Sequence, residues 1–427
     1  MDILIYITLF LITWGLSYIK FKTHMNIVSI FTGLWCFFGI LSSFGMYGMR
    51  TPVLQVHLYV CLFVCIVDMV IMLFGKQHYK MDIRLPSESE NEPTEICEYK
   101  SYASFIQVIA LIFYMPMIFN AFQAFLESGF VGIRNSYFGA EYESQYLFSL
   151  LCKTMPGSFI TGLIVHYIYS AFETRRWKFF IYAALNAILL MLVNGGRYAL
   201  MQVLLSAVVL MVMRSRSVKR ADRQERVFKK KIKKGIVAIA LVMFMVTIFR
   251  EQEIFKNIVV YFSGSFSFLD YILDNPADFG LAERLNGYLT FGCITEPIVL
   301  GLKVLGLTTM KTPSYLFNIV GQNFYDIGSG STTLLFNNNT TVIYYFLRDF
   351  GVWGIVIGGI FLSSLVVYSY NRWSSGSRFH ALIFVYMAVV LLNSIMTYQL
   401  FGCNPFFVVV AMYFCCKRAK IRVVWRR

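Results

Sequence analysis

The chain has 427 residues, of which 58% are hydrophobic and 17% aromatic, whereas only 14% carry a charge. Charged residues make up about 25% of a typical soluble domain, so this composition excludes an ordinary soluble enzyme and predicts a polytopic membrane protein. The net charge of +15 would suit a nucleic-acid-binding protein, but the basic residues lie in short segments between apolar runs, as in cytoplasmic loops. We therefore expect no nucleic-acid partner.

Apolar runs recur along the whole chain, and a membrane-spanning helix needs about 20 mostly apolar residues. The sequence therefore predicts a single all-α integral membrane domain over 1–427. The first run lacks a basic flank and a small-residue cleavage site, so we interpret it as a retained span. The eleven predicted spans are 3–19, 25–47, 53–74, 102–125, 146–171, 179–194, 198–213, 235–250, 341–369, 381–401 and 404–416.

The orientation of these spans follows from a basic block at 214–234, which holds eleven Lys and Arg residues. The positive-inside rule places this block in the cytoplasm. Alternation then puts the N-terminus outside and the C-terminus inside, and 28 of the 38 Lys and Arg residues fall in cytoplasmic segments.

Two polar segments differ from the predicted spans. The acidic, proline-bearing segment 86–98 is typical of a mobile cytoplasmic loop without chemistry of its own. Residues 251–340 form the large external loop region, which is semi-apolar and rich in aromatic residues. A loop of this length without internal structure would be unusual, so we expect it to fold as short helices along the membrane face.

The run LLMLVNGGRYALMQVLL contains two glycines and an arginine between two apolar stretches. Gly195 and Gly196 are predicted to form the outward-facing turn between the sixth and seventh spans, with Arg197 at the base of an external cavity. Arginines are scarce on the outer side of membrane proteins, and charges near a span are candidates for function. The alternative is that Arg197 extends toward the outer headgroups.

Three other charged residues are candidates on similar grounds. Arg134 lies in the short external loop between the fourth and fifth spans, where simple surface exposure is the alternative. Lys153 lies roughly 10 Å below the outer end of the fifth span at 1.5 Å per residue, and we expect it to face an outward cavity. Asp68 is the acid in the middle of the third span, where we expect it to satisfy a polar contact inside the bundle.

The stretch NNNTTVIYYFLRDFGVWGIVIGG places Arg348 and Asp349 just before the apolar part of the ninth span. Adjacent helical residues do not face each other, so each needs a partner elsewhere. Arginine forks match phosphate geometry, and acids can accept a proton from an attacking hydroxyl. The candidate acids are Asp349, Asp326 and Glu296, in that order. The chain has no metal-ligand spacing, Gly-rich nucleotide loop or nucleophile motif, so we expect neither metal nor cofactor.

Two stretches resemble the oligosaccharide repeat-unit polymerases, the O-antigen polymerase (Wzy) group. One is the Gly-Gly-Arg turn within 194–200, and the other is the Asn-rich entry followed by Asp349, Phe350, Gly351 and Gly354. The resemblance implies a fold similar to the GT-C glycosyltransferases and a metal-independent, inverting transfer on the outer face of the bacterial inner membrane. The growing glycan on undecaprenyl diphosphate would be passed to a newly flipped lipid-linked repeat unit. Eleven spans depart from the even numbers common in that group.

The resemblance also implies roles for particular residues. Arg197 and Arg134 would hold and neutralise the departing diphosphate, a kind of stabilisation that is often the largest catalytic contribution. Arg348 would support them, with Asp349 as the first candidate base. The residues expected to bind substrate are Arg284, Arg250, Lys153, Asp326 and Glu296. Expected partners are the undecaprenyl-diphosphate-linked oligosaccharide, membrane lipids, a chain-length regulator and a flippase.

Two other functions remain open. An O-antigen ligase shares the layout but passes glycan to a lipid core, and His57 is the only histidine near the outer side that could serve it. A flippase or transporter of lipid-linked oligosaccharides is the second alternative. Such transporters usually show internal repeats and broken or charged helices at the bilayer midplane, and neither is evident in this sequence.

Overall fold

The computed structural model describes residues 2–76, 99–138, 150–215, 223–250, 254–336 and 340–420. This described part is almost entirely helical and divides into two compact units. The first unit comprises Met1–His78, Phe244–Arg372 and Tyr386–Phe406, and the second comprises Tyr79–Met243, Trp373–Val385 and Phe407–Arg427. The predicted acidic loop over 86–98 and the asparagines at 337–339 lie outside the described residues.

Within the described ranges, five helices are long and apolar enough to cross a membrane. They are α1 (Asp2–Phe21), α3 (Leu54–Phe74), the 103–129 part of α4 (Ala103–Phe138), α7 (Trp177–Asn194) and α14 (Val352–Ser374). Shorter apolar helices are α2 (Ile27–Ser43), α8 (Tyr198–Ser215), α15 (Arg378–Asn393) and α16 (Asn404–Cys416). These helices identify the chain as a membrane-embedded protein.

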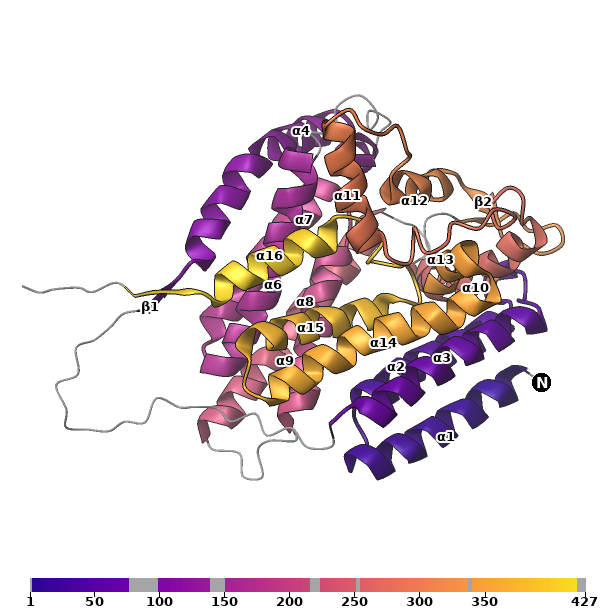
Figure 1. Ribbon diagram of the computed structural model, residues 1–427, viewed down its shortest axis with the longest axis horizontal. Helices are drawn as coiled ribbons and strands as arrows, with labels where there is room; N and C mark the ends of the chain where they lie inside the picture. Colours follow the sequence, from indigo (N-terminus) through magenta and orange to yellow (C-terminus); the bar gives the residue numbers. More distant parts are fainter. Residues whose placement is uncertain are drawn as a thin grey trace, which may run out of the picture. The chain divides into compact units, whose positions relative to one another are not determined.

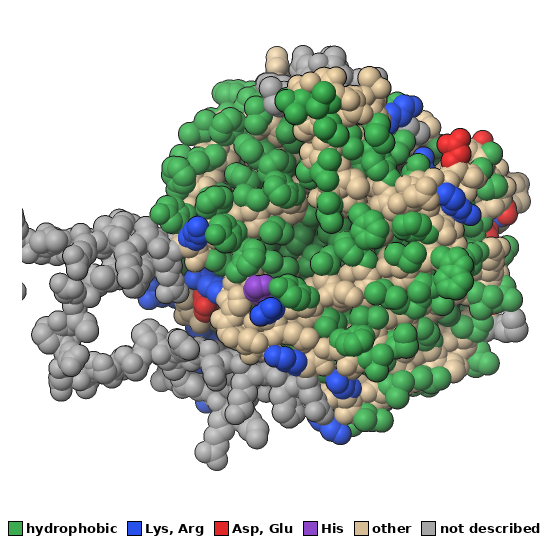
Figure 2. All heavy atoms as spheres, viewed as in Figure 1, with side chains coloured by type: hydrophobic (Ala, Val, Ile, Leu, Met, Phe, Trp, Pro, Cys, Tyr) green, Lys and Arg blue, Asp and Glu red, His purple; other side chains and the backbone are tan. Residues whose placement is uncertain are grey.

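The surface agrees with this interpretation. Figure 2 shows hydrophobic side chains over much of the face in view. Leu4 on α1 is 68% exposed, and Leu126 on α4 is also 68% exposed. Soluble monomers rarely expose apolar patches of this extent. Contact with lipid explains why these hydrophobic side chains lie on the surface.

In the first unit, α1, α2 and α3 lie side by side (Figure 1). Gly39 on α2 permits the close approach of α1, because a Cβ there would lie 2.4 Å from Cζ of Tyr6. The hydroxyl of Tyr6 hydrogen-bonds Nδ1 of His57 on α3 at 2.8 Å. Small residues that let helices approach, together with interhelical hydrogen bonds, are the usual means of packing in membranes.

Asp68 on α3 has the polar partner that the sequence predicted. Its Oδ2 accepts a hydrogen bond of 2.5 Å from the hydroxyl of Thr32 on α2, and both residues are buried. Trp35 on α2 packs beside Phe63 of α3 and Phe266 of α10 (Ile254–Asp274). The core of this unit therefore joins an N-terminal helix pair to a segment more than 200 residues later in the chain.

The predicted ninth span, 341–369, is not one helix. It is divided at Gly351, which has φ 63° and ψ −146°, into α13 (Val342–Phe350) and α14. Helix α13 folds back on α14, and a Cβ at Gly354 would lie only 1.8 Å from the carbonyl oxygen of Phe346. Only glycine readily adopts the backbone conformation at residue 351, so the expectation of one continuous span was wrong here.

The region 251–340 contains helices, as predicted, but they are not all short. Helix α10 has 21 residues, and it is followed by α11 (Gly292–Val304) and α12 (Pro313–Gln322). Two short strands, β2 (Tyr325–Asp326) and β3 (Leu335–Phe336), pair in antiparallel register and were not predicted. A short 3₁₀ turn, η1 (Met46–Gly48), precedes α3 and lies against this hairpin.

In the second unit, α4, α6 (Met155–Thr174), α7 and α8 pack together. A π turn, η3 (Leu150–Thr154), leads into α6, and β1 (Tyr99–Ser101) pairs with β4 (Arg418–Lys420). Helix α4 continues past the predicted span to Phe138, with a kink at Gly129. Arg134 therefore lies within a helix and not in a short loop.

Helix α9 (Arg223–Arg250) corrects the expected boundary of the basic block. The second part of this block, 223–234, is not a loop but the beginning of a continuous helix. Gly235 lets α9 approach α7, because a Cβ at this position would lie 2.3 Å from the indole ring of Trp177. Helices α9, α14, α15 and α16 each contain residues assigned to both units.

Candidate functional site

The Gly-Gly-Arg turn has the predicted form. Helix α7 ends at Gly195, whose φ is 62°, and the N–H of Gly196 donates to Oδ1 of Asn194 at 3.0 Å. Arg197 follows, partly exposed, and its carbonyl accepts the N–H of Met201 at 3.1 Å in the first turn of α8. Arg197 thus adds a cation to the end of α8 that carries the positive end of the helix dipole. Such a position attracts anions.

Two more candidates belong to the same unit. Arg134 lies in the last part of α4, and its side chain is outside the described residues. Lys153 lies in η3, which packs against α4 and α6, and is 8% exposed. The side chain of Lys153 is therefore largely buried, and an outward cavity beside it stays a prediction.

In the first unit, Arg284 and Arg348 are each seated against a glycine of the other's segment. A Cβ at Gly351 would lie 2.9 Å from Nη2 of Arg284, and a Cβ at Gly280 would lie 3.0 Å from Nη2 of Arg348. Gly280 and Gly351 have φ values of 65° and 63°. The two glycines therefore have two roles. They adopt the positive φ that each turn of the backbone requires, and the lack of a side chain lets one guanidinium group approach each glycine.

Both arginines donate hydrogen bonds to the segments around them. Nη1 of Arg284, an exposed residue, donates to the carbonyl of Leu347 at 2.6 Å, near the C-terminus of α13. Nη1 of Arg348 donates to the hydroxyl of Tyr344 at 3.2 Å and to the carbonyl of Leu316 at 3.4 Å, whereas its buried Nε has no hydrogen-bond partner among the described residues. An arginine has five donors, and within the described part of the chain the Nε of Arg348 is one that is not used.

Asp349 holds this pair of segments together. Its buried carboxylate accepts the N–H of Leu289 at 3.2 Å and that of Thr290 at 2.5 Å. The N–H of Asn286 also donates to the carbonyl of Asp349 at 3.2 Å. In this conformation both carboxylate oxygens stabilise the 285–290 turn that follows Arg284.

Asp326 and Glu296, the other two acids, also have local partners. Oδ1 of Asp326, an exposed residue, accepts the N–H groups of Gly328 and Leu334, and these bonds lower its pKa. Glu296 on α11 is 5% exposed and accepts the N–H of Ser314 at 2.7 Å and its hydroxyl at 2.6 Å. Burial raises the pKa of Glu296 to about 7, in the range useful for proton transfer.

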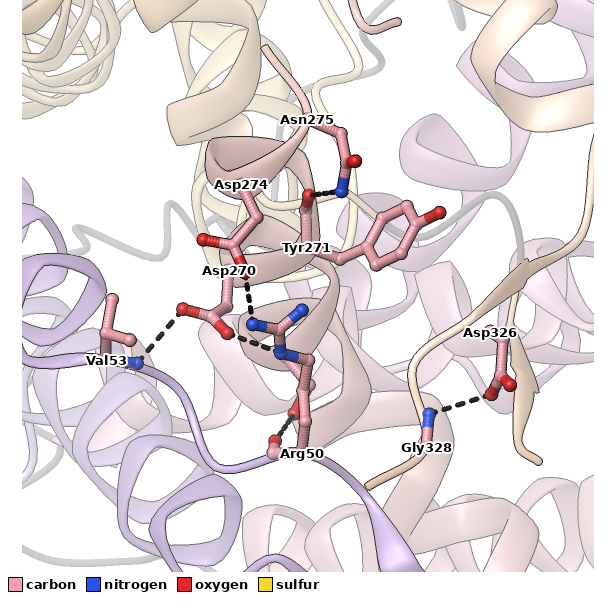
Figure 3. Close-up of polar contacts among 9 residues, drawn as sticks. Arg50, Val53, Asp270, Tyr271, Asp274, Asn275, Asp326 and Gly328 are labelled. Atoms are coloured by element: carbon pink, nitrogen blue, oxygen red, sulfur yellow. Dashed lines mark hydrogen bonds and ion pairs between the residues drawn. The ribbon is translucent and has the colours of Figure 1, made fainter. Parts of the chain in front are cut away.

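A further charged cluster was not predicted. Arg50, in the loop before α3, reaches two carboxylates on α10: its Nε lies 2.6 Å from Oδ2 of Asp270, and its Nη2 contacts Asp274 (Figure 3). Oδ1 of Asp270 accepts the N–H of Val53 at 3.1 Å. Asp270 and Asp274 are four residues apart and so share one helix face, a signal that was present in the sequence. Nothing in the sequence indicated that Arg50 would be their partner.

The candidate residues are divided between the two units. Arg197, Arg134 and Lys153 belong to the second unit. Those of the first unit are Arg250, Arg284, Glu296, Asp326, Arg348 and Asp349. Arg250 is the last residue of α9, and its side chain lies outside the described part. That the two groups serve one cavity stays a prediction.

Comparison with known proteins adds no assignment. No protein-family model matches the chain, and no curated protein or solved structure matches it.

Proposed function

We propose that this chain is a polytopic glycosyltransferase that joins undecaprenyl-diphosphate-linked oligosaccharide repeat units into an O-antigen or capsular polysaccharide. In this proposal the predicted spans, with the ninth divided at Gly351, form a GT-C-like bundle in the bacterial inner membrane, and residues 251–340 lie on its outer side. The position of Arg197 carries the proposal, because a guanidinium at a Gly-Gly turn, beside the N-terminus of α8, is suited to hold a diphosphate.

The reaction would be a single inverting displacement. A sugar hydroxyl of the acceptor attacks the anomeric carbon of the donor glycan, and the bond from that carbon to the diphosphate oxygen breaks. The electron pair leaves with the undecaprenyl diphosphate, and Arg197 and Arg134 stabilise the developing charge. The hydroxyl proton passes to a carboxylate, for which Asp349, Asp326 and Glu296 remain the candidates.

The first unit would supply the supporting cations. Arg284 and Arg348 lie against Gly351 and Gly280, where the lack of a Cβ leaves room for the guanidinium groups, and the Nε of Arg348 has no hydrogen-bond partner among the described residues. The oxygens of Asp349 accept two backbone N–H groups of the 285–290 turn. With these bonds in place, Asp349 would position the neighbouring Arg284. To accept a proton from the substrate, its carboxylate would have to be released by opening of this turn. Exposed aromatic side chains in the same region could stack on sugar rings, as Phe324 at 62% exposure illustrates.

The test is reconstitution of the purified protein in liposomes with lipid-linked repeat units, followed by electrophoresis of the products. A ladder of longer glycans supports polymerisation. Translocation of the lipid-linked sugar without longer products would replace the proposal with transport, and transfer of a single glycan to a lipid core would replace it with ligation.

Arg197→Ala should reduce elongation by at least a hundredfold without loss of expression, in the range seen when one charge-stabilising donor is removed. Arg197→Lys should retain only a small part of the wild-type elongation activity, because an ammonium group lacks the bidentate fork of a guanidinium group. Arg176→Ala is a matched control, since Arg176 is an exposed arginine at the opposite end of α7. Full elongation by Arg197→Ala would remove its assigned role.

A further inference from the structure

The beginning of α9 carries a set of cations on one face, here called the α9 basic face: Arg226, Lys229, Lys230, Lys233 and Lys234. Together with Val237 they line an open hollow of about 520 Å³. Their spacing of three and four residues places them in one stripe along the helix. The opposite face of α9, with Phe228, Ile232 and Gly235, is buried.

The acid of this segment that the structure describes is withdrawn from the surface. Glu225 is fully buried, and Nε of Arg214 donates to its Oε1 at 2.7 Å. Nε of Arg175 lies 3.3 Å from its other oxygen. Lys229, at 3.6 Å from Oε1, is the member of the α9 basic face that approaches this carboxylate. The buried ion pairs fix the beginning of α9 and leave the face itself cationic.

Two observations indicate which anion the face would meet. Past Val237 the exposed residues of α9 become apolar, with Leu241 at 57% exposure, so the cations lie next to a surface suited to lipid. Trp177 packs against α9 at Gly235, between the basic and apolar parts, and stacks on Phe180 with ring centroids 4.9 Å apart. Tryptophan is enriched at the level where a bilayer meets water.

We propose that the α9 basic face is a binding site for the phosphate-bearing headgroups of anionic phospholipids. Clusters of four to eight Lys and Arg residues beside an apolar helix attract such lipids, with about 1 kcal/mol per residue near the surface. Helical presentation distinguishes this site from a basic loop that only sets orientation. Charges held at fixed spacing on a helix can bind several phosphates at one place. A mobile segment would first have to be ordered, which costs more conformational entropy.

The test uses the full chain, purified in detergent and titrated with phosphatidylglycerol or with phosphatidylcholine, with bound lipids counted by native mass spectrometry. We expect the wild-type protein to retain phosphatidylglycerol in preference to phosphatidylcholine, and to lose it as salt screens the cations. Replacement of Lys229, Lys230, Lys233 and Lys234 by Gln should weaken this retention by at least a hundredfold, given about fivefold for each cation.

The matched control removes the same charge elsewhere, by changing Lys20, Lys22, Arg372 and Lys417 to neutral residues. This variant should keep most of the preference. Equal loss in both variants would reduce the effect to net charge and overturn the proposal, as would unchanged retention in the α9 variant. Circular dichroism of both variants checks their helical content.

Two further arms distinguish other anions. Adenosine triphosphate and a short single-stranded RNA are added to the wild-type protein at the same ionic strength. If either competitor displaces phosphatidylglycerol only when it is present in large excess over the lipid, the lipid site is supported. Binding of the nucleotide or the RNA by the α9 basic face in preference to phosphatidylglycerol would overturn it.

Discussion

Replacement of Arg50 by Ala should destabilise the first unit, because it leaves the carboxylate of Asp270 without its cation. Asp270 is fully buried, and Nε of Arg50 lies 2.6 Å from Oδ2. Removal of one partner of a buried ion pair costs about 3–5 kcal/mol. The Arg50 side chain is 27% exposed, so solvent screens part of the interaction, and we expect a loss of about 2–3 kcal/mol.

The assay is unfolding of the detergent-solubilised chain, followed by tryptophan fluorescence, in a double-mutant cycle. Arg50→Ala combined with Asp270→Asn should recover about half of the lost free energy of unfolding. The amide carries no charge to bury, and its carbonyl oxygen can still accept the N–H of Val53. Arg372→Ala, at an exposed position on α14, is the control and should change stability by less than about 0.5 kcal/mol.

The reasoning about Arg50 would be refuted by either of two results. One is an Arg50→Ala protein as stable as the control variant, which would mean that Asp270 does not depend on the guanidinium. The other is a double variant no more stable than Arg50→Ala, which would mean that the loss comes from the packing of the Arg50 side chain and not from the buried carboxylate.

Two further predictions concern other parts of the first unit. Burial raises the pKa of Glu296 to about 7, so the protonated side chain contributes to stability below its ordinary pKa, and this contribution is lost as the pH rises from there through 7. The loss of unfolding free energy, about 3 kcal/mol, should be absent from the Glu296→Gln variant. The same pH dependence of stability in both proteins would contradict this prediction. Gly351→Ala should cost about 2–3 kcal/mol of unfolding free energy through backbone strain and contact with Arg284. Gly301→Ala is the control, because a Cβ there meets nothing within 4 Å, and it should be neutral or slightly stabilising. Equal effects of the two substitutions in thermal unfolding would contradict this account.

Several elements could be predicted because their causes are local. The turn at Gly195 and Gly196 follows from two apolar runs interrupted by residues that readily end a helix, and the structure confirms it. Helices within 251–340 and a polar partner for Asp68 were also expected, and α11 and Thr32 are examples of each. In each case the signal lay within about one helix length of sequence, as hydrophobicity, glycine or an isolated charge.

Other elements were wrong in the prediction because a continuous apolar pattern does not record a change of direction. The run 341–369 is apolar throughout its second part, yet Gly351 turns the chain so that α13 lies against α14. The basic block was expected to be a loop because of its charge, but lysine and arginine favour helices, and α9 begins at Arg223.

The sequence by itself determined the class of the protein, the position of many of its apolar helices and the arginine at the Gly-Gly turn, because burial in lipid and turn formation depend on neighbouring residues. Only the tertiary structure decided that Arg284 and Arg348 seat against Gly351 and Gly280, and that Arg50 meets Asp270. These partners lie more than 60 residues apart in the chain. Their meeting depends on how the helices pack, and composition or periodicity within one segment carries no information about a distant partner.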